Sequence, residues 1–225
     1  MKPMSEQHFA ILRRHMVELI EMHMDLMSDE LGKSTLDESV AAALREVPRH
    51  LFVPVQLIAL AYHDTPLPIG FNKTISQPFV SALMIDLLAP QPGESVLEVG
   101  TGLGYQAAVL AQLASRVWSV EIVEEFAAAA ESRLKEIGLT NVTIRVGDGS
   151  RGWPEHAPFD KILVTAAARQ VPESLVDQLR TGGRMVIPIG PPEAQHLTLV
   201  SKHHRGRIER REVLPVRFTQ LETGQ

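Results

Sequence analysis

The chain has 225 residues, of which 44% are hydrophobic and 22% are charged, and its formal net charge is −5. This length accommodates one α/β domain with a sizeable core, or such a domain with a small cap. The net negative charge argues against a nucleic-acid partner, because proteins that bind phosphate backbones usually carry a basic imbalance. The absence of cysteine excludes disulfides, thiolate zinc sites and the enzymes that attack pyrimidine bases through a cysteine thiolate.

The N-terminal region carries polar residues where a secretory signal would be apolar, namely His8, Arg13, Arg14 and His15. No stretch reaches the roughly 18–20 uninterrupted apolar residues that a membrane-spanning helix needs. We therefore expect a cytoplasmic protein without a membrane partner. His8, His15 and His23 recur at about two helical turns, a spacing too long for the ligands of one ion, so no metal is expected.

Two helices are predicted in the first 50 residues. Apolar side chains recur at helical spacing over residues 5–28, and the glycine-containing segment 32–34 breaks this pattern. Asp37 is a candidate N-cap for a second helix that runs through Glu46. Residues 51–73 are apolar but are interrupted by prolines and a glycine, which predicts a structured loop region.

The chain is expected to form one compact unit with two parts. Residues 1–75 are predicted to form a helical cap and a loop region, and residues 76–225 the core of the fold. Methionines of the first helix are expected to pack either on this core or on a second subunit: Met16, Met22, Met24 and Met27. A monomer and a small homo-oligomer therefore both remain open.

Strands and helices are predicted to alternate from residue 95 onward. The candidate strands cover residues 95–99, 117–121, 142–146, 159–165 and 184–189, and the intervening helices lie near 104–114, 123–137 and 172–180. Such alternation predicts a parallel sheet covered on both faces. Residues 196–202 and 208–213 follow with only Gly206 as a turn residue, which predicts an antiparallel hairpin at the sheet edge. We expect an α/β fold with a mostly parallel sheet of about seven strands.

The first of these strands ends in a glycine-rich loop, E-V-G-T-G-L-G over residues 98–104. Gly100, Gly102 and Gly104 let the backbone turn tightly and approach a ligand. A dinucleotide fold uses G-x-G-x-x-G to seat a pyrophosphate, whereas here the third glycine comes one residue early and Glu98 precedes the loop. S-adenosylmethionine has an ammonium, a sulfonium and a ribose but no phosphate, so the loop, with Thr101 in it, suits this cofactor better.

Two further strand ends carry candidate cofactor ligands. Glu121 ends the second strand, where a carboxylate can accept both ribose hydroxyl groups. Asp148, between Gly147 and Gly149, follows the third strand and is a candidate acceptor for the adenine amino group. Open α/β sheets bind ligands at the carboxyl ends of their strands, so we expect these groups to lie close together.

The fourth strand and a segment upstream of the sheet indicate the methyl acceptor. Residues 166–168 are alanines, which lack the side chains that enzymes methylating nucleic-acid bases use to hold a base. Ser76 precedes a predicted helix through Leu88, with Pro78 in its first turn, and is a candidate N-cap. Because a helix N-terminus also attracts anions, this loop is a reasonable seat for a carboxylate.

A series of short segments over about residues 40–221 matches one enzyme family in order. These segments are V-P-R-H-L-F-V-P (47–54), Y-H-D (62–64), T-I-S-Q-P (74–78), L-E-V-G-T-G-L-G-Y-Q (97–106), S-V-E (119–121), G-D-G (147–149), A-P-F-D (157–160), V-I-P-I-G (186–190) and V-R-F (216–218). Together they resemble protein-L-isoaspartate (D-aspartate) O-methyltransferases. The T-I-S-Q-P segment is the most family-specific, whereas many methyltransferases share the glycine loop.

The resemblance implies a Rossmann-like class I methyltransferase that uses S-adenosyl-L-methionine, releases S-adenosyl-L-homocysteine and needs no metal. It implies methylation of the free α-carboxylate of L-isoaspartyl residues in proteins and peptides, which starts repair through a succinimide. It also implies that Ser76 is the active-site serine and that Thr74, Ile75 and Arg217 bind substrate.

Three departures from the family pattern remain. Asn72 and Lys73 stand where the family usually has glycine and glutamine, and Leu103 replaces a small polar residue of the glycine loop. A cation beside the substrate loop would strengthen carboxylate binding or change substrate preference.

Three alternative functions stay open. A related carboxylate methyltransferase that acts on an aspartate of a dedicated peptide would use the same site, and Lys73 favours it. A non-catalytic S-adenosylmethionine-binding protein is disfavoured by the intact segment around Ser76. An NAD-dependent oxidoreductase is disfavoured by the glycine spacing.

Overall fold

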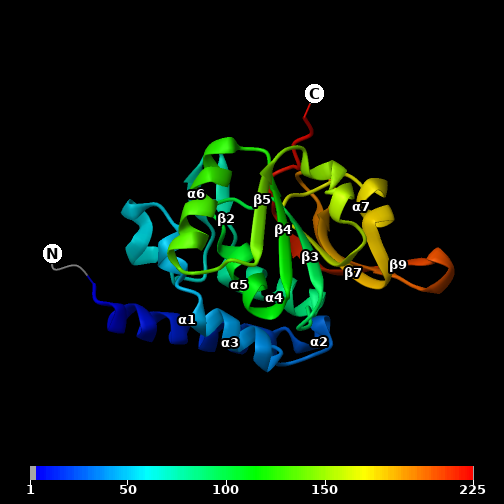
Figure 1. Ribbon diagram of the computed structural model, residues 1–225. Helices are drawn as coiled ribbons and strands as arrows, with labels where there is room; N and C mark the ends of the chain where they lie inside the picture. Colours follow the sequence, from blue (N-terminus) through cyan, green and yellow to red (C-terminus); the bar gives the residue numbers. More distant parts are fainter. Residues whose placement is uncertain (1–3, 225) are drawn as a thin grey trace.

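The computed structural model describes residues 4–224 and has a seven-stranded sheet at its centre (Figure 1). The strands are β3 (Ser95–Val99), β4 (Arg116–Glu121), β5 (Val142–Val146), β6 (Phe159–Val164), β7 (Leu179–Ile189), β8 (Gln195–Lys202) and β9 (Ile208–Val216). Their order is β5-β4-β3-β6-β7-β8-β9, with parallel pairing from β5 to β7 and antiparallel pairing of β8 and β9. The predicted mostly parallel sheet with an antiparallel edge is confirmed.

Helices cover both faces of this sheet, because its strands alternate their apolar side chains between two cores. Val96 packs in the core that holds α4 (Pro78–Leu88), α5 (Tyr105–Leu113) and α6 (Glu124–Glu136), whereas Leu97 packs in the core beside α7 (Glu173–Gln178). The predicted helices of this region are therefore present. Strand order reverses at β3, between β4 and β6, and such a switch point is where open α/β sheets bind ligands.

The N-terminal helices form an outer layer against α4 and α5 (Figure 1). This layer comprises α1 (Glu6–Leu26), α2 (Ser28–Leu31) and α3 (Glu38–Glu46), and Asp37 caps α3 as predicted by accepting from the Ser39 amide at 2.9 Å. The first helix ends at Leu26 with Met27 as its C-cap, close to the predicted end at residue 28, and α2 ends at Leu31 with Gly32 as its C-cap. Met16 and Met24 are buried in the core that this layer shares with the sheet, whereas Met22 is 59% exposed.

The segment predicted as a loop region, residues 51–73, contains regular structure. It includes the second half of a 3-10 turn, η1 (Arg49–Phe52), a second turn, η2 (Val55–Leu60), and strand β1 (Leu67–Gly70), which pairs with β2 (Lys73–Ile75) as a hairpin. Phe71 and Asn72 form its turn with φ of 49° and 55°. Asparagine tolerates this left-handed conformation better than most residues, which explains how Asn72 can replace the glycine usual in the family.

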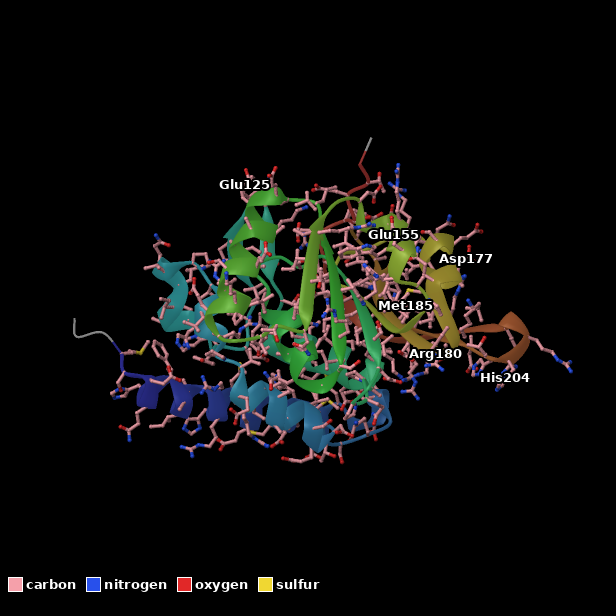
Figure 2. The ribbon with its side chains drawn as sticks, in the orientation of Figure 1. Glu125, Glu155, Asp177, Arg180, Met185 and His204 are labelled. Carbon is pink, nitrogen blue, oxygen red and sulfur yellow. The ribbon has the colours of Figure 1, made fainter. Side chains whose placement is uncertain are left out.

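Figure 2 shows that the tip of the β8–β9 hairpin extends beyond the rest of the sheet. Met185 lies in β7 and is fully buried, whereas His204 lies in the turn η5 (His204–Gly206) at the tip of the β8–β9 hairpin. The turn forms at Gly206, as predicted. Over residues 4–224, no helix is both long enough and apolar enough to cross a membrane.

Candidate active site

A cleft of about 580 Å³ lies where the central strands end. It is lined by Ile69, Lys73, Thr74, Val99, Gly100, Gly102, Val120, Glu121, Ile122, Phe126, Gly149, Thr165, Ala166, Thr219, Gln220, Leu221 and Glu222. Of the predicted cofactor residues, the fold brings Gly100, Gly102, Glu121 and Gly149 to this cleft.

The glycine loop follows β3 in a conformation that other residues rarely adopt. Gly100 has φ of 93° and Gly102 has φ of 54°. A Cβ atom at Gly100 would collide with the Thr165 hydroxyl, which donates to the Gly100 carbonyl at 2.6 Å. This hydrogen bond fixes the loop to the residue that follows β6. Packing against Thr165 therefore stabilises the loop conformation that faces the cleft.

Glu121 presents its carboxylate at the end of β4, with only 5% of the residue exposed. One oxygen accepts from the Gly102 amide at 2.7 Å and the other from the Val123 amide at 2.9 Å. Each carboxylate oxygen has two lone-pair sites, so each retains the capacity for one further donor. The carboxylate is therefore held in a fixed orientation and fits a ligand that offers two neighbouring hydroxyl groups, such as a ribose.

Glu98 lies beneath the glycine loop and outside the lining of the cleft. It is fully buried, and one of its oxygens accepts from the Ser119 hydroxyl, which in turn contacts the Thr101 hydroxyl at 2.5 Å. Its other oxygen has no partner among the described residues. Burial raises the pKa of the Glu98 carboxyl to about 8, an effect that the Ser119 hydrogen bond opposes and the Glu121 charge reinforces. The unpartnered oxygen of Glu98 is thus buried behind the loop and does not line the cleft.

Asp148 also lies outside the cleft lining, although its neighbour Gly149 is part of it. One Asp148 oxygen accepts from the Ser150 amide at 2.9 Å and from the Ser150 hydroxyl at 2.6 Å. The other accepts from the Gly224 amide at 3.1 Å. Gly104, the remaining predicted residue, is the N-cap of α5, and a Cβ atom there would lie 3.1 Å from that of Ala130.

Two further cavities adjoin this cleft. A pocket of about 400 Å³ is lined by Thr101, Leu103, Tyr105 and the predicted substrate residues Thr74, Ile75 and Ser76, among others. A groove of about 1,290 Å³ is lined by His23, Met27, Pro66, Thr74, Ser76, Gln77, Phe79, Val80, Thr165, Leu214, Pro215, Val216, Arg217, Phe218 and Thr219. Thr74 and Thr165 line all three cavities, so this junction joins the cleft to the groove.

Ser76 faces the groove and does not cap α4 as the sequence had predicted. The N-cap is Gln77, and Pro78 is the first helical residue, as expected. The helix can begin without a serine cap because proline at its first position already has the helical φ. Proline also lacks the backbone N–H that would otherwise be left without a partner at the start of the helix. Ser76 is half-buried and its hydroxyl is not needed as the cap.

A carboxylate from the preceding loop anchors the chain on the far side of Ser76. Asp64 accepts from the Gln77 side chain at 2.9 Å and from the Phe79 amide at 2.8 Å. The His23 ring nitrogen Nδ1, from α1, lies 2.9 Å from the same carboxylate. The helical cap thus reaches the groove that contains Ser76, a contact that the sequence pattern did not indicate.

The groove is mostly apolar, and its charge is concentrated at one residue. Arg217 is exposed at the end of β9 and supplies a guanidinium, while the other lining side chains apart from His23 are neutral. Arginine is suited to carboxylates because its planar donors match both oxygens. The predicted substrate residues Thr74, Ser76 and Arg217 therefore share one groove.

A C-terminal segment, residues 219–222, forms part of the cleft wall and was not predicted. Thr219 and Leu221 exchange main-chain hydrogen bonds with Ala167 at 2.8 Å each. Glu222 forms an ion pair with Lys73, which comes from the β1–β2 hairpin. Lys73 therefore lines the cleft at the strand ends and is paired with Glu222, whereas the sequence had suggested a cation beside the substrate loop. Short polar segments like this one carry no periodicity that would reveal such a position.

Comparisons with known proteins show the family of this chain. The model of the protein-L-isoaspartate(D-aspartate) O-methyltransferase (PCMT) family matches residues 21–225. Protein-L-isoaspartate O-methyltransferase 1 of Polaromonas sp. (strain JS666 / ATCC BAA-500) is 51% identical over 222 residues, covering 99% of this chain and 94% of that protein.

Two solved structures share the fold. A protein-L-isoaspartate O-methyltransferase is 29% identical with a TM-score of 0.76, and the match covers 89% of this chain and 65% of that one. A structure titled as such a methyltransferase from Plasmodium falciparum, in complex with S-adenosyl-L-homocysteine, has a TM-score of 0.79 at 23% identity and covers 94% of this chain and 99% of that one.

Proposed function

Because the chain belongs to the protein-L-isoaspartate (D-aspartate) O-methyltransferase family, we propose that its groove holds an isoaspartyl residue and that Ser76 orients the carboxylate to be methylated. The protein is a class I methyltransferase that transfers a methyl group from S-adenosyl-L-methionine to the free α-carboxylate of L-isoaspartyl residues in damaged proteins and peptides. The resulting ester starts repair through a succinimide.

The main task of the protein in this reaction is to align the substrate carboxylate with the methyl group of the donor. S-adenosyl-L-methionine supplies a methyl group already activated by its sulfonium. The substrate carboxylate has a pKa near 4 and is ionised at neutral pH, so no general base has to remove a proton. The carboxylate oxygen forms the new bond to the methyl carbon while the carbon–sulfur bond breaks and its electron pair returns to sulfur. The protein contributes by holding the oxygen in line and by excluding water.

The observation that carries the Ser76 assignment is the junction of the three cavities. Ser76 lines both the groove and the pocket that adjoins the cofactor cleft, beside Thr74. A serine hydroxyl can donate one hydrogen bond to a carboxylate oxygen. We assign Thr74 and Ile75 to substrate positioning at this junction, and Arg217 to the second charge-assisted contact with the substrate.

The proposed cofactor contacts follow from the cleft. Gly100, Gly102 and Gly149 give the ligand access to main-chain groups, and Glu121 accepts the ribose hydroxyl groups. Thr101, Gly104 and Glu98 act from behind the loop: the first two shape it, and Glu98 provides negative charge for the ammonium group. Asp148 is proposed to support the adenine side through Gly149.

The remaining expectations concern the protein's surroundings. We propose that residues 1–75 act as a cap on a core of residues 76–225 and that the enzyme works in the cytoplasm, as a monomer or small homo-oligomer. Its partners would be isoaspartyl proteins and peptides and not membranes or nucleic acids; the net charge of −5 supports the last point.

Substitution of Ser76 tests the assignment. Ser76→Ala removes one hydrogen bond to a charged group, worth about 1.5–3 kcal/mol, so kcat for an isoaspartyl peptide should fall about tenfold to a hundredfold. Cofactor affinity and thermal stability should stay near those of the parent, because Ser76 is not the helix cap. Ser132→Ala is the matched control, since this exposed serine lies on α6 and bonds only to Glu136. Full turnover by Ser76→Ala would contradict the assignment.

A further inference from the structure

Arg49 is a fully buried arginine that the chemistry described above does not use. It begins the η1 turn and has 0% exposure. Burying a guanidinium removes it from water at a large free-energy cost, and apolar residues of similar size often stabilise a core as well or better. Desolvation accordingly lowers the pKa of Arg49, although neighbouring Tyr105 opposes this change. Packing alone therefore does not explain an arginine at this position.

The contacts of Arg49 join three segments that meet behind the active site. Its Nε donates to the Ala61 carbonyl at 2.8 Å, and its Nη2 donates to the Ser76 carbonyl at 2.7 Å. The guanidinium carbon lies 4.7 Å from the centre of the Tyr105 ring, in a cation–π arrangement. Its third nitrogen, Nη1, and the Tyr105 hydroxyl have no partner within the described part of the chain.

Two of these three segments form part of the active site, and each adjoins the site of a different ligand. Ser76 belongs to the substrate loop, whereas Tyr105 is the first residue of α5 and directly follows the glycine loop of the cofactor site. Both residues line the 400 Å³ pocket between cleft and groove, and Arg49 lies outside the lining of all three cavities. The guanidinium therefore stands behind the wall where the substrate loop meets the cofactor loop.

We infer that Arg49 is a positioning residue, which fixes the main chain of Ser76 relative to the cofactor loop and so aligns the Ser76 hydroxyl with the methyl donor. This inference rests on the proposed role of Ser76. Asp64 holds the same loop from the other side, through Gln77 and Phe79, so Ser76 is fixed both at its own carbonyl and one residue later. A displacement of about 1 Å at a reacting group can cost on the order of a hundredfold in rate.

Lysine cannot replace this arrangement. An ammonium group keeps the positive charge but lacks the planar fork that reaches two carbonyl groups while it stacks on a ring. In Arg49→Lys, kcat for an isoaspartyl peptide should fall between about tenfold and about a hundredfold. Because Arg49 touches neither ligand cavity, the peptide KM and the dissociation constant for S-adenosyl-L-homocysteine should change by less than about threefold.

Two further variants separate positioning from folding. Arg133→Lys is the matched control, because Arg133 donates to the Leu51 carbonyl of the same η1 turn at 2.9 Å but lies on the exposed side of α6; it should keep the parental kcat. Arg49→Met removes the buried charge while it keeps much of the volume. It should remain folded in a thermal melt and lose at least as much kcat as Arg49→Lys. If neither Arg49 variant folds, Arg49 is a structural residue and the inference is overturned.

A double-mutant cycle with Ser76→Ala decides whether Arg49 acts through Ser76. If it does, Arg49→Lys should lower kcat by less than about twofold in the Ser76→Ala background, because the hydroxyl that it positions is already gone. Effects that multiply would overturn the inference while leaving the role of Ser76 intact, as would a parental kcat in Arg49→Lys. Full turnover by Ser76→Ala alone would instead reject the role of Ser76, a failure of the proposed function that this single variant identifies.

Discussion

The cofactor cleft and the substrate groove lie side by side but are built in opposite ways. The cleft places its glycine loop and its main carboxylate, Glu121, at the ends of neighbouring strands, and two backbone amides already hold this carboxylate. The groove is mainly apolar and is assembled from α1, the β2–α4 connection and the end of β9. The central carboxylate of the cleft is thus oriented by backbone groups next to it, whereas the groove has no such fixed group and depends on how distant segments pack.

This difference reflects what each site must recognise. A cofactor of fixed shape rewards polar groups held in one geometry, because no binding energy is then lost in ordering them. A repair enzyme must accept isoaspartyl residues among varied neighbours, and an apolar groove with few directional groups tolerates such variation. Substitutions in the two regions should therefore change different kinetic constants.

The largest effect is expected in the cleft. Glu121→Ala removes the proposed ribose contacts, worth about 1.5–3 kcal/mol, so the affinity for S-adenosyl-L-homocysteine should fall about tenfold to a hundredfold in a calorimetric titration. Glu125→Ala is the matched control, since Glu125 is exposed at the start of α6 (Figure 2). The peptide KM at saturating cofactor should stay unchanged. Parental cofactor affinity in a folded Glu121→Ala variant would reject the ribose assignment.

A smaller effect, on the other constant, is expected in the groove. Arg217→Ala should raise the peptide KM about fivefold to tenfold, because it removes the proposed charge-assisted contact with the substrate. The rise should not be larger, because solvent screens the attraction of an exposed guanidinium. The rise should shrink as salt is added, and cofactor affinity should not change. Arg210→Ala, at an exposed position of the same strand outside the groove lining, serves as the control. A loss confined to cofactor affinity would contradict the assignment of Arg217 to the substrate groove.

Lys73 tests the boundary between the two regions. Its ion pair with Glu222 spans the cofactor cleft, and exposed pairs contribute about 0.2–1 kcal/mol. Lys73→Gln should therefore lower cofactor affinity by no more than about fivefold, and Lys73→Gln combined with Glu222→Gln should match the single variant. If Lys73 contacts substrate instead, as a dedicated peptide enzyme would require, the peptide KM should rise while cofactor affinity stays constant.

The smallest effect concerns pH. With both ligands saturating, kcat should stay nearly flat from about pH 6 to 8, because the attacking carboxylate is ionised throughout. Cofactor affinity should instead rise toward pH 8. The reason is that Glu98, with a pKa of about 8 in the ligand-free protein, holds a proton below that pH and provides less negative charge for the ammonium group. A steep rise of kcat itself would show that the reaction removes a proton.

The fold was largely predictable because strand and helix periodicity is local. All seven strands of the sheet were anticipated, and so was the cap at Asp37. The β1–β2 hairpin was missed because prolines and a glycine interrupt it, and because its turn uses Phe71 at a positive φ that few residues adopt. The first helix ends at Leu26, close to the predicted end at residue 28, and Gly32, with a φ of 73°, caps α2 where the glycine break was expected.

The candidate site was predictable only in part. Gly100, Gly102, Glu121 and Gly149 line one cleft, as expected, because motifs at strand ends meet wherever a parallel sheet forms. The burial of Glu98 and the anchoring of Asp148 by Ser150 and Gly224 depend on tertiary packing, and so do the places of His23 and of residues 219–222. The role of Ser76 was predicted from family resemblance. The groove around Ser76 could not be predicted, because it forms only when α1 and β9 pack against the loop that carries this residue.

The central claim is that this enzyme recognises the isoaspartyl carboxylate. The most direct test measures labelled methyl transfer from S-adenosyl-L-methionine to two peptides that are identical except that one has isoaspartate where the other has aspartate. The account predicts methylation of the isoaspartyl peptide with flat kcat from about pH 6 to 8, and background transfer to the aspartyl peptide. Equal methylation of both peptides, or transfer to neither, would contradict it.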